Sequence, residues 1–233
     1  MDELLDRFLR GTDEAEVEEC GRDLAVRNDA ADVPWLLAAL RDPLEARRLG
    51  AVYALGFSRR DRRAVVPLMN VLLDRTETAA VRGQAAECLG MLGQRRAIKA
   101  LIRCSRDPSP DVRFWCVFGL GQITALRRKK LTHAGIRALE ARLGDMAVPQ
   151  ATLGYWPIHF EALAMLGGLS ARHAGALQQQ LQHVLSDPVS APQLWRWADF
   201  YASDTREAAL KIAAAGYDPA TFGRPHLEGG PRQ

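Results

Sequence analysis

Residues 33–56 read VPWLLAALRDPLEARRLGAVYALG, and the same order of apolar residues, turn and closing glycine returns twice. The second copy is VPLMNVLLDRTETAAVRGQAAECLG at residues 66–90, and the third is IKALIRCSRDPSPDVRFWCVFGLG at residues 98–121. The closing glycines lie 34 and 31 residues apart, a period typical of stacked helical hairpins. One hairpin cannot bury its apolar faces alone, so we expect an all-α chain whose hairpins stack into a solenoid.

The third copy indicates how each hairpin forms. Apolar residues recur at three- and four-residue intervals from Ile98, which predicts a helix with one buried face. Pro108 ends that helix, because proline lacks an N–H and restricts the residue before it. Pro110 begins the second helix, since proline suits the first helical position. We expect the closing residue, Gly121, to end the second helix in the left-handed conformation.

Agreement with this pattern falls on either side of the three copies. Residues 1–32 are predicted to form an acidic N-terminal capping repeat, residues 33–121 three regular repeats, and residues 122–217 degenerate repeats. Together they predict a single domain, residues 1–217: a right-handed α-solenoid of about five to six hairpins and about ten to twelve helices. Residues 218–233 are rich in proline and glycine, and we expect a flexible C-terminal tail.

The composition is that of a folded, water-soluble chain, with 48% hydrophobic and 25% charged residues. The opening MDELLDRFLR lacks the basic start and apolar core of a secretory signal, and no apolar run is long enough to span a membrane. The four cysteines have no C-x-x-C spacing, so we expect buried, reduced thiols. These features predict a cytoplasmic protein without membrane insertion.

The phrase D-P…V-R-x6-L-G, followed by a short turn with R-A-[IV]-x-x-L, resembles the bacterial HEAT-like repeats named after phycobilisome lyases. The resemblance covers residues 33–121. It implies an α-solenoid and a role in binding, because members of that family are mostly non-catalytic scaffolds, adaptors and inhibitors. Some members are lyases, hydroxylases or DNA glycosylases. The motif itself specifies a fold and no activity, because function lies in the sites placed on such scaffolds.

Charge is segregated along the chain. Residues 1–32 carry eleven acids and four bases, whereas residues 33–130 carry eight acids and nineteen bases. Ten of those nineteen bases lie in the three connectors that follow the repeats, and equivalent connectors of a solenoid align along one edge. We call this set the basic ridge: Arg59, Arg60, Arg62, Arg63, Arg95, Arg96, Arg127, Arg128, Lys129 and Lys130. Such a stripe suits an acidic protein surface or a phosphate backbone, although ordinary surface turns are also charged.

A second recurring set pairs an aspartate after the first helix with an arginine early in the second. We call it the ladder, and it consists of Asp42, Asp74, Asp107, Arg48, Arg82 and Arg113. Arginine offers several donors, and helix ends leave carbonyls without partners. Residues that return at the same place in each repeat therefore predict a structural role, with the side chains bonding to the next turn and to one another.

Aromatic residues break the repetition. A position close behind the ladder arginine changes from glycine in the first two repeats to Trp115 and then Phe160, and further aromatics gather towards the C-terminus. We predict that five rings line a partner-binding groove on the second helices: Trp115, Trp156, Phe160, Trp195 and Trp197. Two alternatives stay open, namely that large rings fill the core of degenerate repeats and that the groove holds a flipped base.

No pattern in the sequence indicates catalysis. There is no glycine-rich phosphate loop, and no pair of histidines is spaced for zinc. The related deoxyhypusine hydroxylases use several His-Glu pairs to hold iron, and this chain has only H159-F-E161. We therefore predict no cofactor, no metal and a non-catalytic protein-binding scaffold or adaptor, such as an assembly factor or an immunity protein, whose partner has an acidic surface. The alternative is a nucleic-acid-binding protein, including an alkylated-base DNA glycosylase.

Overall fold

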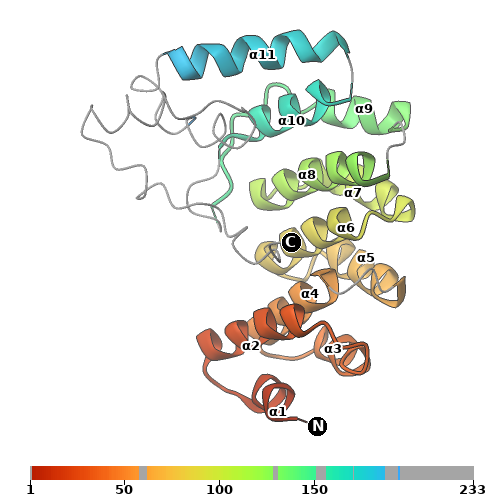
Figure 1. Cartoon of the computed structure of the whole chain (residues 1–233), viewed down its shortest axis with the longest axis vertical. Helices are drawn as coiled ribbons and strands as arrows, with labels where there is room; N and C mark the ends of the chain where they lie inside the picture. Colours follow the sequence, from red (N-terminus) through yellow and green to blue (C-terminus); the bar gives the residue numbers. More distant parts are fainter. Residues whose placement is uncertain are drawn as a thin grey trace, which may run out of the picture. The chain divides into compact units, whose positions relative to one another are not determined.

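The computed structural model describes residues 2–57, 62–127, 131–150, 156–169, 171–186 and 194. Within these residues the chain forms eleven α-helices and two short 3-10 turns (Figure 1). None of the described residues lies in a β-strand. The prediction of an all-α solenoid is confirmed, and no helix in these ranges is long and apolar enough to cross a membrane. The chain divides into two compact units, residues 1–130 and 131–233, while the single domain over residues 1–217 stays a prediction.

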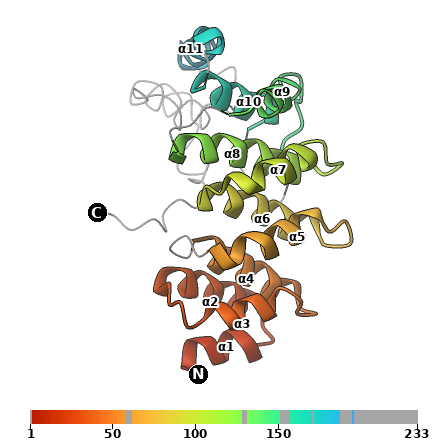
Figure 2. The ribbon, with the colours of Figure 1, turned by 90° about the vertical axis from the view of Figure 1, so that its right-hand side faces the viewer.

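The first unit consists of four consecutive helical hairpins. Their helices are α1 (Glu3–Arg10) and α2 (Glu14–Arg27), α3 (Val33–Ala39) and α4 (Glu45–Phe57), α5 (Val65–Leu73) and α6 (Ala79–Leu92), and α7 (Ile98–Cys104) and α8 (Pro110–Arg127). The 3-10 turns η1 (Arg62–Ala64) and η2 (Arg95–Ala97) lead into α5 and α7. The second helices of successive hairpins, α2, α4, α6 and α8, pack side by side in one layer, and α3, α5 and α7 form the other layer (Figure 2).

The second unit contains α9 (His133–Glu140), α10 (Ile158–Gly167) and α11 (Ala171–Ser186), and α10 packs against both of the others. Two hairpins are expected among the degenerate repeats, and the first, from residues 136–143 and 158–167, corresponds to α9 and α10. The first helix of the next predicted hairpin is present as α11. Its predicted partner at residues 195–201 or 205–215, and the predicted tail at residues 218–233, lie outside the described residues.

Helix boundaries in the first unit follow from capping chemistry. The Asp13 carboxylate accepts a hydrogen bond from the backbone N–H of Glu16 at 2.8 Å, so the acidic run after it begins α2. Asn28, in the left-handed conformation with φ 54°, follows the last residue of α2. Gly93, with φ 63°, does the same after α6. Pro110 begins α8, as the sequence predicts.

The closing glycines of the repeats lie inside helices, so the left-handed end predicted at Gly121 is wrong: α8 continues to Arg127. Glycine is needed there because neighbouring second helices approach closely. A Cβ atom on Gly90 of α6 would lie 2.5 Å from the Cα atom of Gly119 in α8. A Cβ atom on Gly56 of α4 would lie 2.1 Å from the Sγ atom of Cys88 in α6. At Gly56 and Gly90 the repeated glycine therefore marks a place where the second helices of adjacent repeats approach closely.

Candidate functional site

The described part of the basic ridge consists of two identical turns. Arg62 and Arg63 begin η1, Arg95 and Arg96 begin η2, and all four side chains are exposed. The alanine that closes each turn is fully buried, which fixes both turns to the core in the same way. Because α5 packs against α7, the two arginine pairs follow one edge of the first unit. The other ridge residues lie outside the described residues, except Arg127, which is the last residue of α8.

The ladder arginines Arg48 and Arg113 make the same contacts in different repeats. Nη1 of Arg48 donates to the backbone oxygens of Asp42 and Pro43 at 2.8 and 3.0 Å. Nη1 of Arg113 donates to those of Asp107 and Pro108 at 2.9 and 2.8 Å. Each arginine thus holds the turn between the two helices of its own hairpin. These hydrogen bonds indicate a structural role for both arginines, because they satisfy carbonyl groups that the turn leaves without partners.

The third ladder arginine, Arg82, departs from this arrangement. Its Nε donates to the backbone oxygen of Leu72 at 3.2 Å, and its guanidinium pairs with both carboxylate oxygens of Asp107 in the next repeat. The predicted bond with Asp74 does not form, because that carboxylate accepts from the backbone N–H and hydroxyl of Thr76. The turn of this repeat is two residues longer than the others, which carries Arg82 away from Asp74. Arg82 therefore joins two repeats.

The described aromatic residues of the predicted groove are buried, so they are not exposed anchors. Trp115, Trp156 and Phe160 are 9%, 3% and 6% exposed. The Trp115 ring lies 3.0 Å from the point where a Cβ atom on Gly83 would be, so it fills space that this glycine leaves open. The indole N–H of Trp156 donates to the buried carboxylate of Glu161 at 2.8 Å. These rings fill the core, the alternative kept above, and Trp195 and Trp197 lie outside the described residues.

A different set of side chains lies on the solvent side of the second helices. We define the second-helix face as six half-buried residues of α4 and α6: Leu49, Tyr53, Phe57, Gln84, Glu87 and Met91. The rings of Tyr53 and Phe57 pack together with their centroids 4.5 Å apart. Their spacing along α4 is i to i+4, which places the two rings on one face of the helix and can be seen in the sequence. This face combines apolar area, two rings and one carboxyl group.

The carboxyl group of Glu87 is the unusual charge on this face. Burial raises its pKa from the ordinary value of 4.5 to about 7, although a hydrogen bond from the Gln84 amide, 2.6 Å from Oε2, opposes the shift. The same environment raises the pKa of Tyr53, first through burial and then through the nearby Glu87 and Cys88, while Arg22 of α2 opposes the rise. Glu87 is therefore poised to exchange a proton near neutral pH.

Burial of Glu87 makes stability depend on pH with a definite sign. The folded chain holds this proton more tightly than the unfolded chain, so the stabilising contribution is present below about pH 4.5 and lost as pH rises to about 7. We expect Glu87→Gln to raise the free energy of unfolding by about 1–2 kcal/mol at pH 8 and to change it little at pH 4.5. Urea unfolding at both pH values measures this. The exposed Glu19→Gln is the matched control, and an equal gain at both pH values would contradict the assignment.

All four cysteines are buried and free. Burial raises the pKa of the Cys88 and Cys116 thiols well above their ordinary value. A hydrogen bond with the Cys116 thiol lowers the pKa of Cys104 to about 7, and Arg82 supports this against the opposing effect of burial. The Cys104 side chain is 5% exposed, and its Sγ lies 3.7 Å from the backbone oxygen of Leu72. We assign the two thiols to the core of the hairpin formed by α7 and α8.

The H159-F-E161 pair lies at the start of α10. The Glu161 carboxylate is 1% exposed and accepts the Trp156 indole N–H, so it is engaged inside the second unit. Nδ1 of His159 is buried without a hydrogen-bond partner among the described residues. The same ranges contain no group of three or more His, Cys, Asp or Glu side chains that could hold a metal ion. The donor set around Glu161 does not match the several His-Glu pairs of an iron site.

Comparison with known proteins identifies the repeat. A family model described as HEAT repeats matches residues 33–121 and, overlapping with them, residues 65–151. The deoxyhypusine hydroxylase of Bos taurus is 29% identical over 107 residues, which is 46% of this chain and 34% of that protein. The enzyme of Rattus norvegicus is 29% identical over 96 residues, 41% of this chain and 32% of that protein. The chain thus matches about a third of the length of these relatives.

Among solved structures, the complex of CpcE and CpcF of phycocyanin lyase from Nostoc sp. PCC7120 is similar in fold. The match has a TM-score of 0.51 at 21% identity and covers 82% of this chain and 72% of that one. Identity at this level shows a shared arrangement of helices and carries no residue of a lyase site to this chain.

Proposed function

Because the chain belongs to the HEAT-repeat family, we propose that it is a non-catalytic scaffold or adaptor that binds another protein. The observation that carries the proposal is the repetition of an exposed arginine pair at η1 and η2, each pair on a turn fixed by a buried alanine. A repeated charge on a rigid edge suits a partner with an acidic surface, because both surfaces then meet in register.

The ridge and the second-helix face would contribute to binding in different ways. Exposed arginines steer an acidic partner and speed association, but salt screens them over about 8–10 Å. Half-buried rings such as Tyr53 and Phe57 supply contact energy that salt does not screen. The proposal therefore assigns the association rate to the ridge and much of the residence time to the second-helix face.

We attribute the sequence similarity to deoxyhypusine hydroxylases to the repeats. It covers about a third of those proteins, and the HEAT-repeat model matches residues 33–121 and 65–151 of this chain. Nucleic acid is the competing partner, because a phosphate backbone also meets a basic ridge. The four described ridge arginines have no aromatic residue beside them in η1 or η2 on which a base would stack.

Removing the ridge should weaken partner binding without unfolding the protein. We expect the variant with serine at Arg62, Arg63, Arg95 and Arg96 to keep its melting temperature within a few degrees, because exposed turns contribute little to stability. It should bind the partner recovered from the native host at least about tenfold more weakly at low salt, with the difference shrinking as salt rises.

The matched control removes the same charge elsewhere on the surface. It carries serine at four other exposed positions: Arg10, Arg22, Arg103 and Arg137. Equal binding by wild type and the ridge variant at low salt would show that the ridge is a solvated edge. A gel shift of mixed-sequence DNA that disappears in the ridge variant, but not in the control, would move the assignment to nucleic acid.

A further inference from the structure

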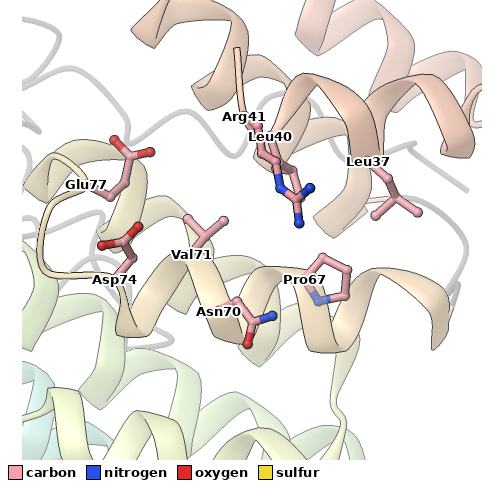
Figure 3. Close-up of a pocket in the computed structure, with 8 residues that line it drawn as sticks. All are labelled: Leu37, Leu40, Arg41, Pro67, Asn70, Val71, Asp74 and Glu77. Carbon is pink, nitrogen blue, oxygen red and sulfur yellow. The ribbon is translucent and has the colours of Figure 1, made fainter. Parts of the chain in front are cut away.

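A cleft of about 240 Å³ lies between the first helices of two adjacent repeats (Figure 3). Leu37 of α3 and Leu40, which directly follows that helix, form one wall, and Pro67 and Val71 of α5 form the other. This volume is below the roughly 300–1,000 Å³ of sites that enclose small ligands. The size suits one or two apolar side chains of a polypeptide.

The acids at one end of the cleft are already engaged within the protein. The Asp74 carboxylate accepts from the backbone N–H and the hydroxyl of Thr76 at 2.9 and 2.7 Å. The Glu77 carboxylate accepts hydrogen bonds from Nε and Nη2 of Arg48 at 2.7 and 2.9 Å. Both oxygens of Glu77 and Oδ1 of Asp74 thus have hydrogen-bond donors, and only Oδ2 of Asp74 is left for solvent.

The donors that line the cleft are not engaged. Arg41 is exposed at the end of the α3 wall, and Figure 3 shows its guanidinium pointing into the space between the two helices. Within the described part of the chain, neither the Arg41 guanidinium nor the Asn70 amide has a hydrogen-bond partner. Three of the four acid oxygens at the end of the cleft are engaged, whereas the guanidinium and the amide are free. The free donors favour a ligand that brings hydrogen-bond acceptors, and a carboxylate matches the guanidinium best.

The cleft arginine belongs to a row that the regular repeats share. Arg41 directly precedes Asp42, Arg106 directly precedes Asp107, and Arg75 directly follows Asp74. All three arginines are exposed, in the turn between the first and second helices of their hairpin. This turn row lies at the opposite end of α5 and α7 from η1 and η2, so it is distinct from the basic ridge.

We propose that the cleft and the turn row dock an acidic segment of the partner protein. One apolar side chain of that segment enters between α3 and α5, a neighbouring Asp or Glu carboxylate bonds to Arg41, and further acids reach Arg75 and Arg106. The inference deepens the proposed scaffold function and rests on it, because it names the kind of segment that the scaffold recognises. It does not depend on the ridge.

The test uses a displayed library of random decapeptides, selected on the immobilised full chain at low salt. Enriched peptides should carry an apolar residue within two positions of an Asp or Glu. Fluorescence polarisation with the synthesised peptides should show at least about tenfold weaker binding to Arg41→Ser and Leu37→Asp. The control Arg103→Ser removes another exposed arginine and should change affinity less than about twofold. Circular dichroism and melting temperature verify that each variant is folded.

A charge swap gives the sharpest result. Arg41→Glu should lose the acidic peptide and regain binding when the peptide's acid is replaced by lysine. Peptides without an acid, peptides insensitive to Arg41→Ser, or no enriched peptide at all would overturn the cleft assignment. So would release of the peptide from the Arg41 site by single-stranded DNA, which would assign the site to phosphate. The ridge variant could lose binding to the host partner while the cleft variants keep it. In that case the proposed scaffold function would stand, and only the assignment of the cleft would be withdrawn.

Discussion

Replacing Arg82 with methionine is expected to lower the free energy of unfolding by about 3–5 kcal/mol, the largest effect of any substitution considered. Arg82 is 6% exposed and Asp107 is 4% exposed. The guanidinium satisfies both carboxylate oxygens of Asp107 and the backbone oxygen of Leu72. Methionine fills much of the same volume but leaves a buried carboxylate with the Ser109 N–H as its remaining donor, at 3.1 Å.

Urea unfolding of four proteins separates the ion pair from simple burial. These are wild type, Arg82→Met, Asp107→Asn and the double variant. The double variant should be destabilised by less than the sum of the single variants, because the second substitution removes a group that the first has already left without its partner. The exposed Arg103→Met should cost less than about 0.5 kcal/mol. A loss below about 1 kcal/mol for Arg82→Met would show that the pair does not join the two repeats.

The repeat period predicts the hairpins well because apolar spacing and proline act within a few residues of their position. Pro110 begins α8 and the stripe from Ile98 is α7, as the sequence indicates. Packing between repeats is harder to predict, because the partners are about thirty residues apart in sequence. The Arg82 contact shows this: a turn two residues longer moves its partner from Asp74 to the next repeat's Asp107.

The candidate site divides in the same way, into features that nearby residues predict and features that depend on packing between repeats. The ridge arginines at η1 and η2 are exposed because surface turns carry charge, and their local sequence is enough to predict that. The burial of Trp115 depends on the missing side chain of Gly83 in the preceding repeat, which the aromatic pattern alone does not reveal. The cleft between α3 and α5 likewise arises from the spacing of two helices, so Arg41 gives no sign in the sequence of facing an apolar wall.

The close approach of the second helices leads to the other large effect. We expect Gly90→Ala to lower the free energy of unfolding by about 2–3 kcal/mol, although alanine favours a helix by about 1 kcal/mol over glycine. The added Cβ atom would lie 2.5 Å from the Cα atom of Gly119. Because that atom is backbone, no change of rotamer relieves the contact, and α6 and α8 must move apart.

The same substitution at an open helical glycine is the matched control. Gly175 lies in α11, and a Cβ atom there meets nothing within 4 Å. Gly175→Ala should therefore raise the stability of its helix by about 0.5–1 kcal/mol, the opposite sign for an identical chemical change. Urea and thermal unfolding of both variants measure the two effects. A Gly90→Ala variant as stable as wild type would mean that α6 and α8 do not cross at glycine.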